Sequence, residues 1–167
     1  IRGDRGAPEV RDATPRWHDG EREVQRLLDQ CFAAGESGEL LHDGPHRRVD
    51  AWDLPGESTP SVVVKTYHRR GGLLRDPRDR ALRRNADLRE WRALVALYAA
   101  GLPVPEPLAR GRAANGEALL VMRRVGREDL ASRLRSADEA ERGRLVRRLA
   151  ETVSHLHAAG WAHGDLH

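Results

Sequence analysis

The sequence has little of several residue types, and each scarcity excludes a class of structure. A single cysteine, Cys31, rules out an internal disulfide and a cysteine-based metal cluster. No apolar run reaches the roughly 18 to 20 residues that cross a bilayer, and the first residues do not resemble a secretory signal. We therefore expect a protein of a reducing, cytoplasmic compartment.

Lysine is equally scarce, because Lys65 is the only lysine among the 29 basic residues. The formal net charge is only +3, so the arginine pairs are compatible with phosphate, anionic lipid or RNA but equally with a solvated surface. Hydrophobic residues make up 39% of the chain and charged residues 33%, which places it outside the composition typical of disorder. We expect an ordered core.

The first third of the chain changes its pattern twice. Residues 1–18 are rich in Gly, Pro, Arg and Asp and indicate a lead-in without structure of its own. From Gly20 to Ala34 the apolar residues recur at helical spacing, which predicts an amphipathic helix. Three short extended runs follow, separated by turn residues, and predict antiparallel strands at residues 39–42, 48–52 and 61–67.

The remaining pattern alternates helix, hairpin and helix. Residues 76–100 predict a helix that starts at the N-cap Asp76 and ends at Gly101. Residues 107–112 and 117–124 predict a second hairpin around Asn115-Gly116. A short helix near Leu130 and a longer one, capped from Ser136, complete the order. The fold class is therefore α+β, with a five-stranded antiparallel sheet, a helix on it, and further helices after residue 126.

Lys65 is the first residue whose chemistry stands out. It ends a Val-Val-Val run that predicts a buried strand, and a cation in that position needs a partner. Glu90 on the following helix is the candidate, and Asp87, one turn earlier, is its competitor. A lysine held by a carboxylate is a compact charge suited to nucleotide phosphates, although a lysine that reaches solvent from a strand end is the plainer interpretation.

The last residues, His163-Gly164-Asp165-Leu166-His167, form a polar loop directly after an amphipathic helix. Asp165 is suited to accept or orient the proton of a hydroxyl that receives a phosphate, with His163 holding the loop in shape. A metal site built from these histidines and Asp165 is disfavoured, because His155 and His157 point to different faces of their helix.

Taken together, the lysine on the third strand, the helix glutamate, the proline-rich connector at residues 103–107 and the His-Gly-Asp-Leu-His loop resemble the protein-kinase-like superfamily. The runs Val-Val-Val-Lys-Thr-Tyr, Arg-Glu-Trp-Arg-Ala-Leu and Ala-Leu-Leu-Val-Met are most similar to the bacterial lipopolysaccharide core kinases of the Kdo/heptose type. The resemblance implies a lead-in and helix at 1–37, a kinase-like N-lobe at 38–125 and the start of a C-lobe at 126–167.

The same resemblance implies an ATP-binding site. Lys65 would contact the α- and β-phosphates and pair with Glu90, and Asp165 would be the catalytic aspartate. The adenine would be covered by valines and meet the chain near the end of the second hairpin. The implied nucleotide-binding residues are Lys65, Glu90, Val49, Val63, Met122, Arg124 and Val125.

Three departures from the kinase pattern matter. Gly44-Pro45-His46-Arg47-Arg48 stands where a full Gly-x-Gly-x-x-Gly loop is expected, and His163-Gly164 replaces His-Arg. The asparagine and the Asp-Phe-Gly-type aspartate that bind Mg²⁺ are expected beyond residue 167, from which we expect a partial sequence.

The acceptor implied by the resemblance is an inner-core sugar of lipopolysaccharide, reached by a cytoplasmic enzyme with possible peripheral contact to the inner membrane. Three alternatives stay open: an aminoglycoside or choline phosphotransferase-like kinase, an RNA-associated atypical kinase of the RIO or tRNA-modification type, and an inactive nucleotide-binding module. The arginine-rich stretch between Lys65 and Glu90 favours the lipopolysaccharide or RNA-associated kinase over the small-molecule kinase.

Overall fold

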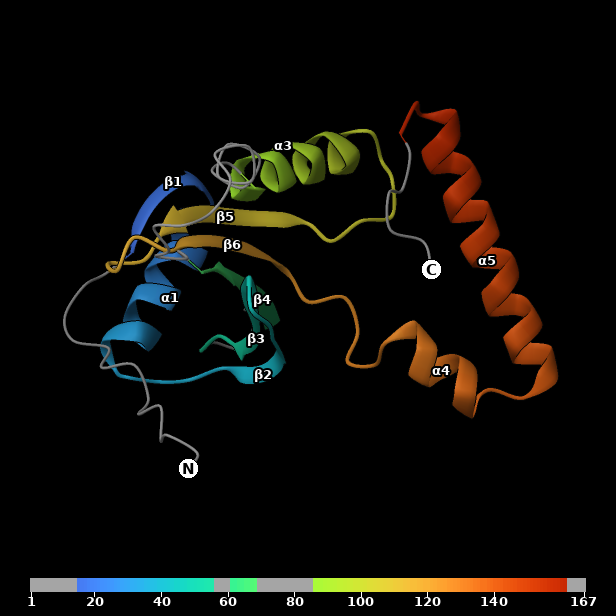
Figure 1. The fold of residues 1–167 in the computed structure, drawn as a ribbon, viewed down its shortest axis with the longest axis horizontal. Coiled ribbons are helices and arrows are strands. Elements are labelled where there is room, and N and C mark those ends of the chain that lie inside the picture. Colours follow the sequence, from blue (N-terminus) through green and yellow to red (C-terminus); the bar gives the residue numbers. More distant parts are fainter. Residues whose placement is uncertain (1–14, 56–60, 69–85, 162–167) are drawn as a thin grey trace.

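The computed structural model describes residues 15–55, 61–68 and 86–161. Within them the fold is α+β, with a six-stranded antiparallel sheet in the order β1-β5-β6-β4-β3-β2 (Figure 1). The strands are β1 (Arg16–Gly20), β2 (Glu39–Asp43), β3 (Arg47–Asp53), β4 (Ser61–Tyr67), β5 (Pro107–Arg112) and β6 (Ala118–Arg123). The helices are α1 (Arg22–Ala33), α3 (Ala86–Ala99), α4 (Leu130–Ser136) and α5 (Glu139–Ala158).

The sequence predicted five strands, and the sixth, β1, lies in what was expected to be an unstructured lead-in. It pairs antiparallel with β5, and its residues are mostly exposed, so it lacks the alternating apolar pattern that marks a strand. The strand is defined instead by its pairing with β5, which brings the two backbones close together. A Cβ on Gly20 would lie 2.1 Å from the Leu108 carbonyl oxygen, so the pairing requires glycine at this position. The five-strand prediction was therefore wrong by one edge strand, which only its partner reveals.

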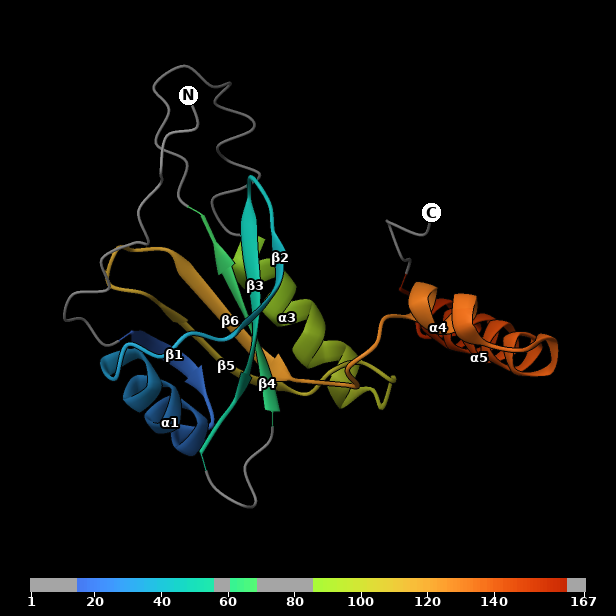
Figure 2. The same cartoon turned by 90° about the horizontal axis from the view of Figure 1, so that it is seen from below.

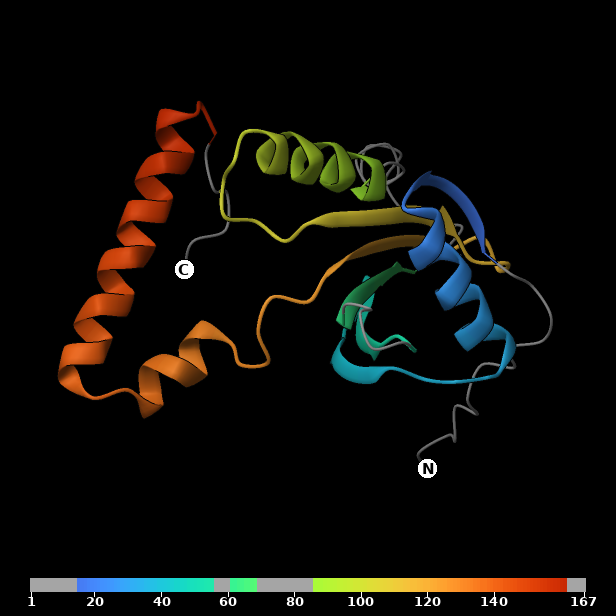
Figure 3. The ribbon, with the colours of Figure 1, turned by 180° about the vertical axis from the view of Figure 1, so that it is seen from behind.

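The hydrophobic core lies between α1 and one face of the sheet (Figure 3). The helical spacing predicted for residues 20–34 is confirmed, since Val24, Leu27, Leu28 and Cys31 are buried and Phe32, the fifth residue of the stripe, packs partly buried against them. Because side chains alternate along a strand, Val62 and Val64 of β4 point to this face. The largest fully buried side chains of this core are Leu28, Leu108, Val62 and Val121.

Helix α3 lies over the opposite face of the sheet, next to β5 and β6 (Figures 1 and 3). Its predicted apolar face is only partly used, because Val95 and Tyr98 stay exposed. The one residue that α3 buries is a carboxylate, Asp87. The predicted helix start at Asp76 lies outside the described residues.

Helices α4 and α5 lie away from the sheet, and α4 lies next to the first turn of α5 only (Figures 1 and 2). Neither buries a residue. The prediction that Ser136 caps α5 was wrong: the Asp138 side chain accepts the hydrogen bond from the Glu141 amide. Ser136 is the last residue of α4, so it does not cap α5, and Asp138, two residues later, is the N-cap.

Candidate active site

The candidate site is built around Glu90, which lies in the first half of α3 and points to the sheet. Lys65 Nζ lies 2.5 Å from Glu90 Oε1, and the Tyr67 hydroxyl donates a hydrogen bond to Glu90 Oε2. Lys65 and Tyr67 stand two residues apart on β4, so both side chains lie on the α3 face of the sheet. One carboxylate thus binds a cation and a hydroxyl from the same strand.

Glu90 stays ionised in this setting. Burial opposes the charge, but the hydrogen bonds from Lys65 and Tyr67 outweigh it, and the pKa of Glu90 lies below its usual value. Burial, and then the hydrogen bond to Glu90, raise the pKa of Tyr67, so its hydroxyl keeps its proton and acts as a donor. The cluster therefore holds Lys65 by an ionised partner.

Tyr67 is a site residue that the sequence prediction missed. A signal for it existed, because the residue two positions after Lys65 on a strand must share its face. The sequence prediction paired Lys65 with a glutamate of the following helix and did not include Tyr67, the next residue of the strand on the same face. The hydroxyl supplies Glu90 with a second donor, which fixes the orientation of the carboxylate as well as its charge.

Asp87, the competitor considered for Lys65, has a different partner. Its carboxylate is almost fully buried and lies 3.4 Å from Arg110 Nη1 on β5. Arg110 also contacts Asp19 of β1 at 3.3 Å. These contacts attach the first turn of α3 to the sheet, one turn before Glu90, and so help to set where Glu90 lies.

Three of the residues that the resemblance implied for nucleotide binding, Val49, Val63 and Met122, have their side chains on the same face as Lys65. Val49 is the Cα partner of Lys65, and Val63 pairs with Met122 across β4 and β6. Directly opposed residues of an antiparallel pair share a face, so the sheet brings these side chains together beside Lys65. Ala51, opposite Val63, joins the same row as a small, buried residue.

The backbone after β6 is only partly free to meet a ligand. The Arg124 amide donates to the Ser61 carbonyl at 2.9 Å, which extends the β4–β6 ladder, and the Arg124 side chain binds Glu39 at 3.0 Å. Val125 is 72% exposed, and among the described residues its amide has no backbone acceptor. Of the two predicted backbone contacts, the Val125 amide is the available donor.

The turn between β2 and β3 occupies the place where kinases carry a glycine-rich loop. The Gly44 amide donates to the Arg47 carbonyl at 3.0 Å, and Pro45 has no amide hydrogen. A phosphate-binding loop relies on several free backbone amides. This turn therefore has fewer amides to offer than such a loop.

The comparison with protein families matches residues 36–167 to the model of the lipopolysaccharide kinase (Kdo/WaaP) family. The chain belongs to this family. No curated protein and no solved structure matches it. Membership relates the chain to kinases that act on the lipopolysaccharide core, and the matched range includes every predicted site residue.

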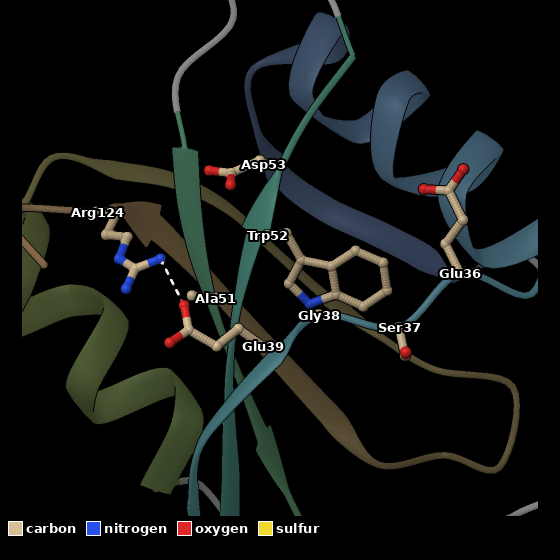
Figure 4. A pocket seen from close by; sticks show the side chains of 8 residues that line it. All are labelled: Glu36, Ser37, Gly38, Glu39, Ala51, Trp52, Asp53 and Arg124. Carbon is tan, nitrogen blue, oxygen red and sulfur yellow. Dashed lines mark hydrogen bonds and ion pairs between the residues drawn. The ribbon is translucent and has the colours of Figure 1, made fainter.

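In this Kdo/WaaP family member a hollow of about 240 Å³ opens at the β2–β3 edge (Figure 4). Its lining residues are Glu36, Ser37, Gly38, Glu39, Ala51, Trp52, Asp53 and Arg124. Arg124 is the only predicted site residue, within the described part of the chain, that lines it. A Cβ on Gly38 would lie 2.6 Å from Trp52 Nε1, so glycine is required for this approach. The hollow is distinct from the Lys65 cluster.

The described residues contain neither a cluster of metal ligands nor a membrane-spanning helix. No three His, Cys, Asp or Glu side chains among them lie together as metal ligands. None of the helices in residues 15–55 and 86–161 is long and apolar enough to span a membrane. The predicted loop with His163 and Asp165 lies outside the described residues.

Proposed function

We propose that this chain carries the nucleotide-binding site of an ATP-dependent kinase that phosphorylates a sugar hydroxyl of the lipopolysaccharide core. One observation carries the proposal beyond family membership: the only lysine of the chain lies 2.5 Å from a glutamate of helix α3, on the sheet face that α3 partly covers. Phosphoryl transfer depends on positioned charge more than on covalent chemistry. A lysine held in this way is suited to that task.

ATP would lie on the α3 face, between the sheet and the start of the helical lobe. Lys65 would bind the α- and β-phosphates, with Glu90 and Tyr67 holding it in place. Val49, Val63 and Met122 would cover the adenine, and the Val125 amide would meet its edge. This assignment is supported by the shared face of these residues in the strand register.

The reaction follows from these positions. The acceptor hydroxyl oxygen attacks the γ-phosphorus, the bond from that phosphorus to the β–γ bridging oxygen breaks, and ADP leaves. Asp165 would take or orient the proton released by the hydroxyl. Lys65 would stabilise the negative charge that grows on the leaving diphosphate.

Magnesium, when bound, would neutralise phosphate charge. The described residues include no cluster of metal ligands, so none of the steps above is assigned to a metal held by them. The ligands are expected from an asparagine and an aspartate beyond residue 167, following the kinase pattern.

The proposal includes a location and a set of competing acceptors. An enzyme that acts on a membrane-anchored core sugar would work at the cytoplasmic face of the inner membrane, in peripheral contact with it. Aminoglycosides, choline and RNA are the acceptors of the alternative kinase classes, and an inactive nucleotide-binding module would phosphorylate none of them.

The test is a phosphotransfer assay with γ-labelled ATP and an acceptor panel of Kdo-containing core oligosaccharide, an aminoglycoside, choline and tRNA. We expect label on the core oligosaccharide, and its loss in Lys65→Ala and Asp165→Asn. The matched control is Arg26→Ala, since Arg26 lies exposed on α1 on the other face of the sheet.

If the labelled phosphate appeared on the aminoglycoside, choline or tRNA and not on the core oligosaccharide, the sugar would not be the acceptor. Undiminished transfer by Asp165→Asn would contradict the role of that carboxylate. ATP binding with no transfer to any acceptor would favour the inactive module over the kinase.

A further inference from the structure

Arg47 is the first residue of β3, directly after the β2–β3 turn. Its Cα partner is Tyr67, so both side chains lie on the same face of the sheet. Lys65 stands two residues before Tyr67 and shares that face. Arg47 and Lys65 are therefore diagonal neighbours, at a spacing of about 7 to 8 Å between Cα atoms.

Within the group formed by Arg47, Lys65, Tyr67 and Glu90 the charges do not balance. Glu90 uses Oε1 for Lys65 and Oε2 for Tyr67, which leaves two cations against one carboxylate. The positive charge of Arg47 lies close enough to contribute to the lowered pKa of Glu90. Yet Arg47 itself is exposed and has no ion pair with any residue that the structure describes.

The adjacent arginine shows the contrast. Arg48 points to the other face, where its guanidinium binds the buried Asp50 at 2.8 Å. The Arg48 guanidinium is thus used within the fold, whereas the Arg47 guanidinium has no hydrogen bond or ion pair with any residue in the described ranges. Guanidinium groups bind phosphate oxygens through paired, charge-assisted hydrogen bonds.

We propose that Arg47 binds the terminal phosphates of the nucleotide, in place of the backbone amides of a glycine-rich loop. The Gly44 amide is already used within the turn and Pro45 has none to offer, so the turn needs another donor for a phosphate. Arg47 is a cation at that end of the sheet, on the face of Lys65. Arg112 lies in the same cross-strand row, but its guanidinium already donates to the Gly116 carbonyl and lies 3.9 Å from the Asp87 carboxylate. The inference rests on the proposed nucleotide-binding function and adds a residue to it.

The experiment is isothermal titration of the 167-residue chain with ATP, with adenosine and with tripolyphosphate. The variants are Arg47→Gln, Arg47→Lys and the control Arg26→Gln, which removes the same charge from α1. We expect Arg47→Gln to bind ATP and tripolyphosphate about 10-fold more weakly, because a charge-assisted hydrogen bond is lost. Adenosine affinity should stay unchanged, Arg47→Lys should lose less, and Arg26→Gln should match the parent.

Two results would overturn the inference alone: ATP binding by Arg47→Gln equal to that of the parent, or an equal loss for ATP and adenosine, which would indicate altered folding. Thermal melting of each variant by circular dichroism checks the second case. If the parent chain binds neither ATP nor adenosine, the proposed function itself fails and the Arg47 role fails with it.

Discussion

Replacing Asp87 with alanine tests how α3 is held on the sheet. Asp87 is 5% exposed and is the residue that α3 buries, and its carboxylate lies 3.4 Å from Arg110 Nη1 and 3.9 Å from Arg112 Nη2. Removing it leaves Arg110, whose side chain is only 15% exposed, without its inner partner. The first turn of α3 then loses its polar attachment to β5.

The expected loss in the free energy of unfolding depends on which ion pairs Arg110 keeps once the Asp87 carboxylate is removed. Breaking a fully buried ion pair costs about 3 to 5 kcal/mol, because the surviving charge is left desolvated. Arg110 keeps its contact with Asp19 at 3.3 Å, so the loss should be smaller, about 2 kcal/mol. For a chain of this length that free energy corresponds to a melting temperature lower by about 4 to 8 °C.

Urea unfolding followed by circular dichroism measures the change in the free energy of unfolding. The control is Glu23→Ala, which breaks the fully exposed pair with Arg26 and should leave the unfolding midpoint unchanged. Repeating Asp87→Ala in an Arg110→Met background should give a smaller loss, since the two residues act together. Equal midpoints for Asp87→Ala and Glu23→Ala would refute the reasoning.

Two further predictions concern the core and the pH dependence. Leu28→Ala should lower the free energy of unfolding by about 2 to 5 kcal/mol in the same urea assay, because Leu28 is fully buried between α1 and the sheet; a loss below 1 kcal/mol would contradict that packing. The lowered pKa of Glu90 means that its stabilisation is present above the pKa of the unfolded state, near 4.5, and is lost as the pH falls through the folded value. The stability difference between the parent and Glu90→Gln should therefore shrink on acidification from about pH 5, and a difference that is constant between pH 7 and pH 3 would disprove this linkage.

Much of the fold was predictable because local patterns carry it. The helical spacing of residues 24–31 predicted α1, and the runs of β-branched and apolar residues predicted β3, β4 and β6. Asn115-Gly116 predicted the turn between β5 and β6. The sequence predicted that Lys65 has a carboxylate partner on the following helix, with Glu90 as candidate and Asp87 as competitor, because a cation next to a buried Val-Val-Val run requires a partner nearby.

What the sequence could not predict depends on contacts between segments far apart in the chain. β1 pairs with residues more than 85 positions away, and its own pattern carries no strand signal. Asp87 and Glu90 are both carboxylates on one helix, one turn apart, and no local rule tells which of them meets Lys65. Only the placement of α3 over the sheet, next to β5 and β6, separates them.

The sequence by itself determined the order of helices and strands from α1 onward, the apolar stripe of α1 and the identity of the lysine and its candidate partners, because periodicity and composition are local properties. Only the tertiary structure decided that Asp87 attaches α3 to Arg110, that Tyr67 shares Glu90 with Lys65, and that Arg47 faces the same side without a partner among the described residues. These decisions follow from strand register and helix placement, which bring charges from separate segments within hydrogen-bonding distance.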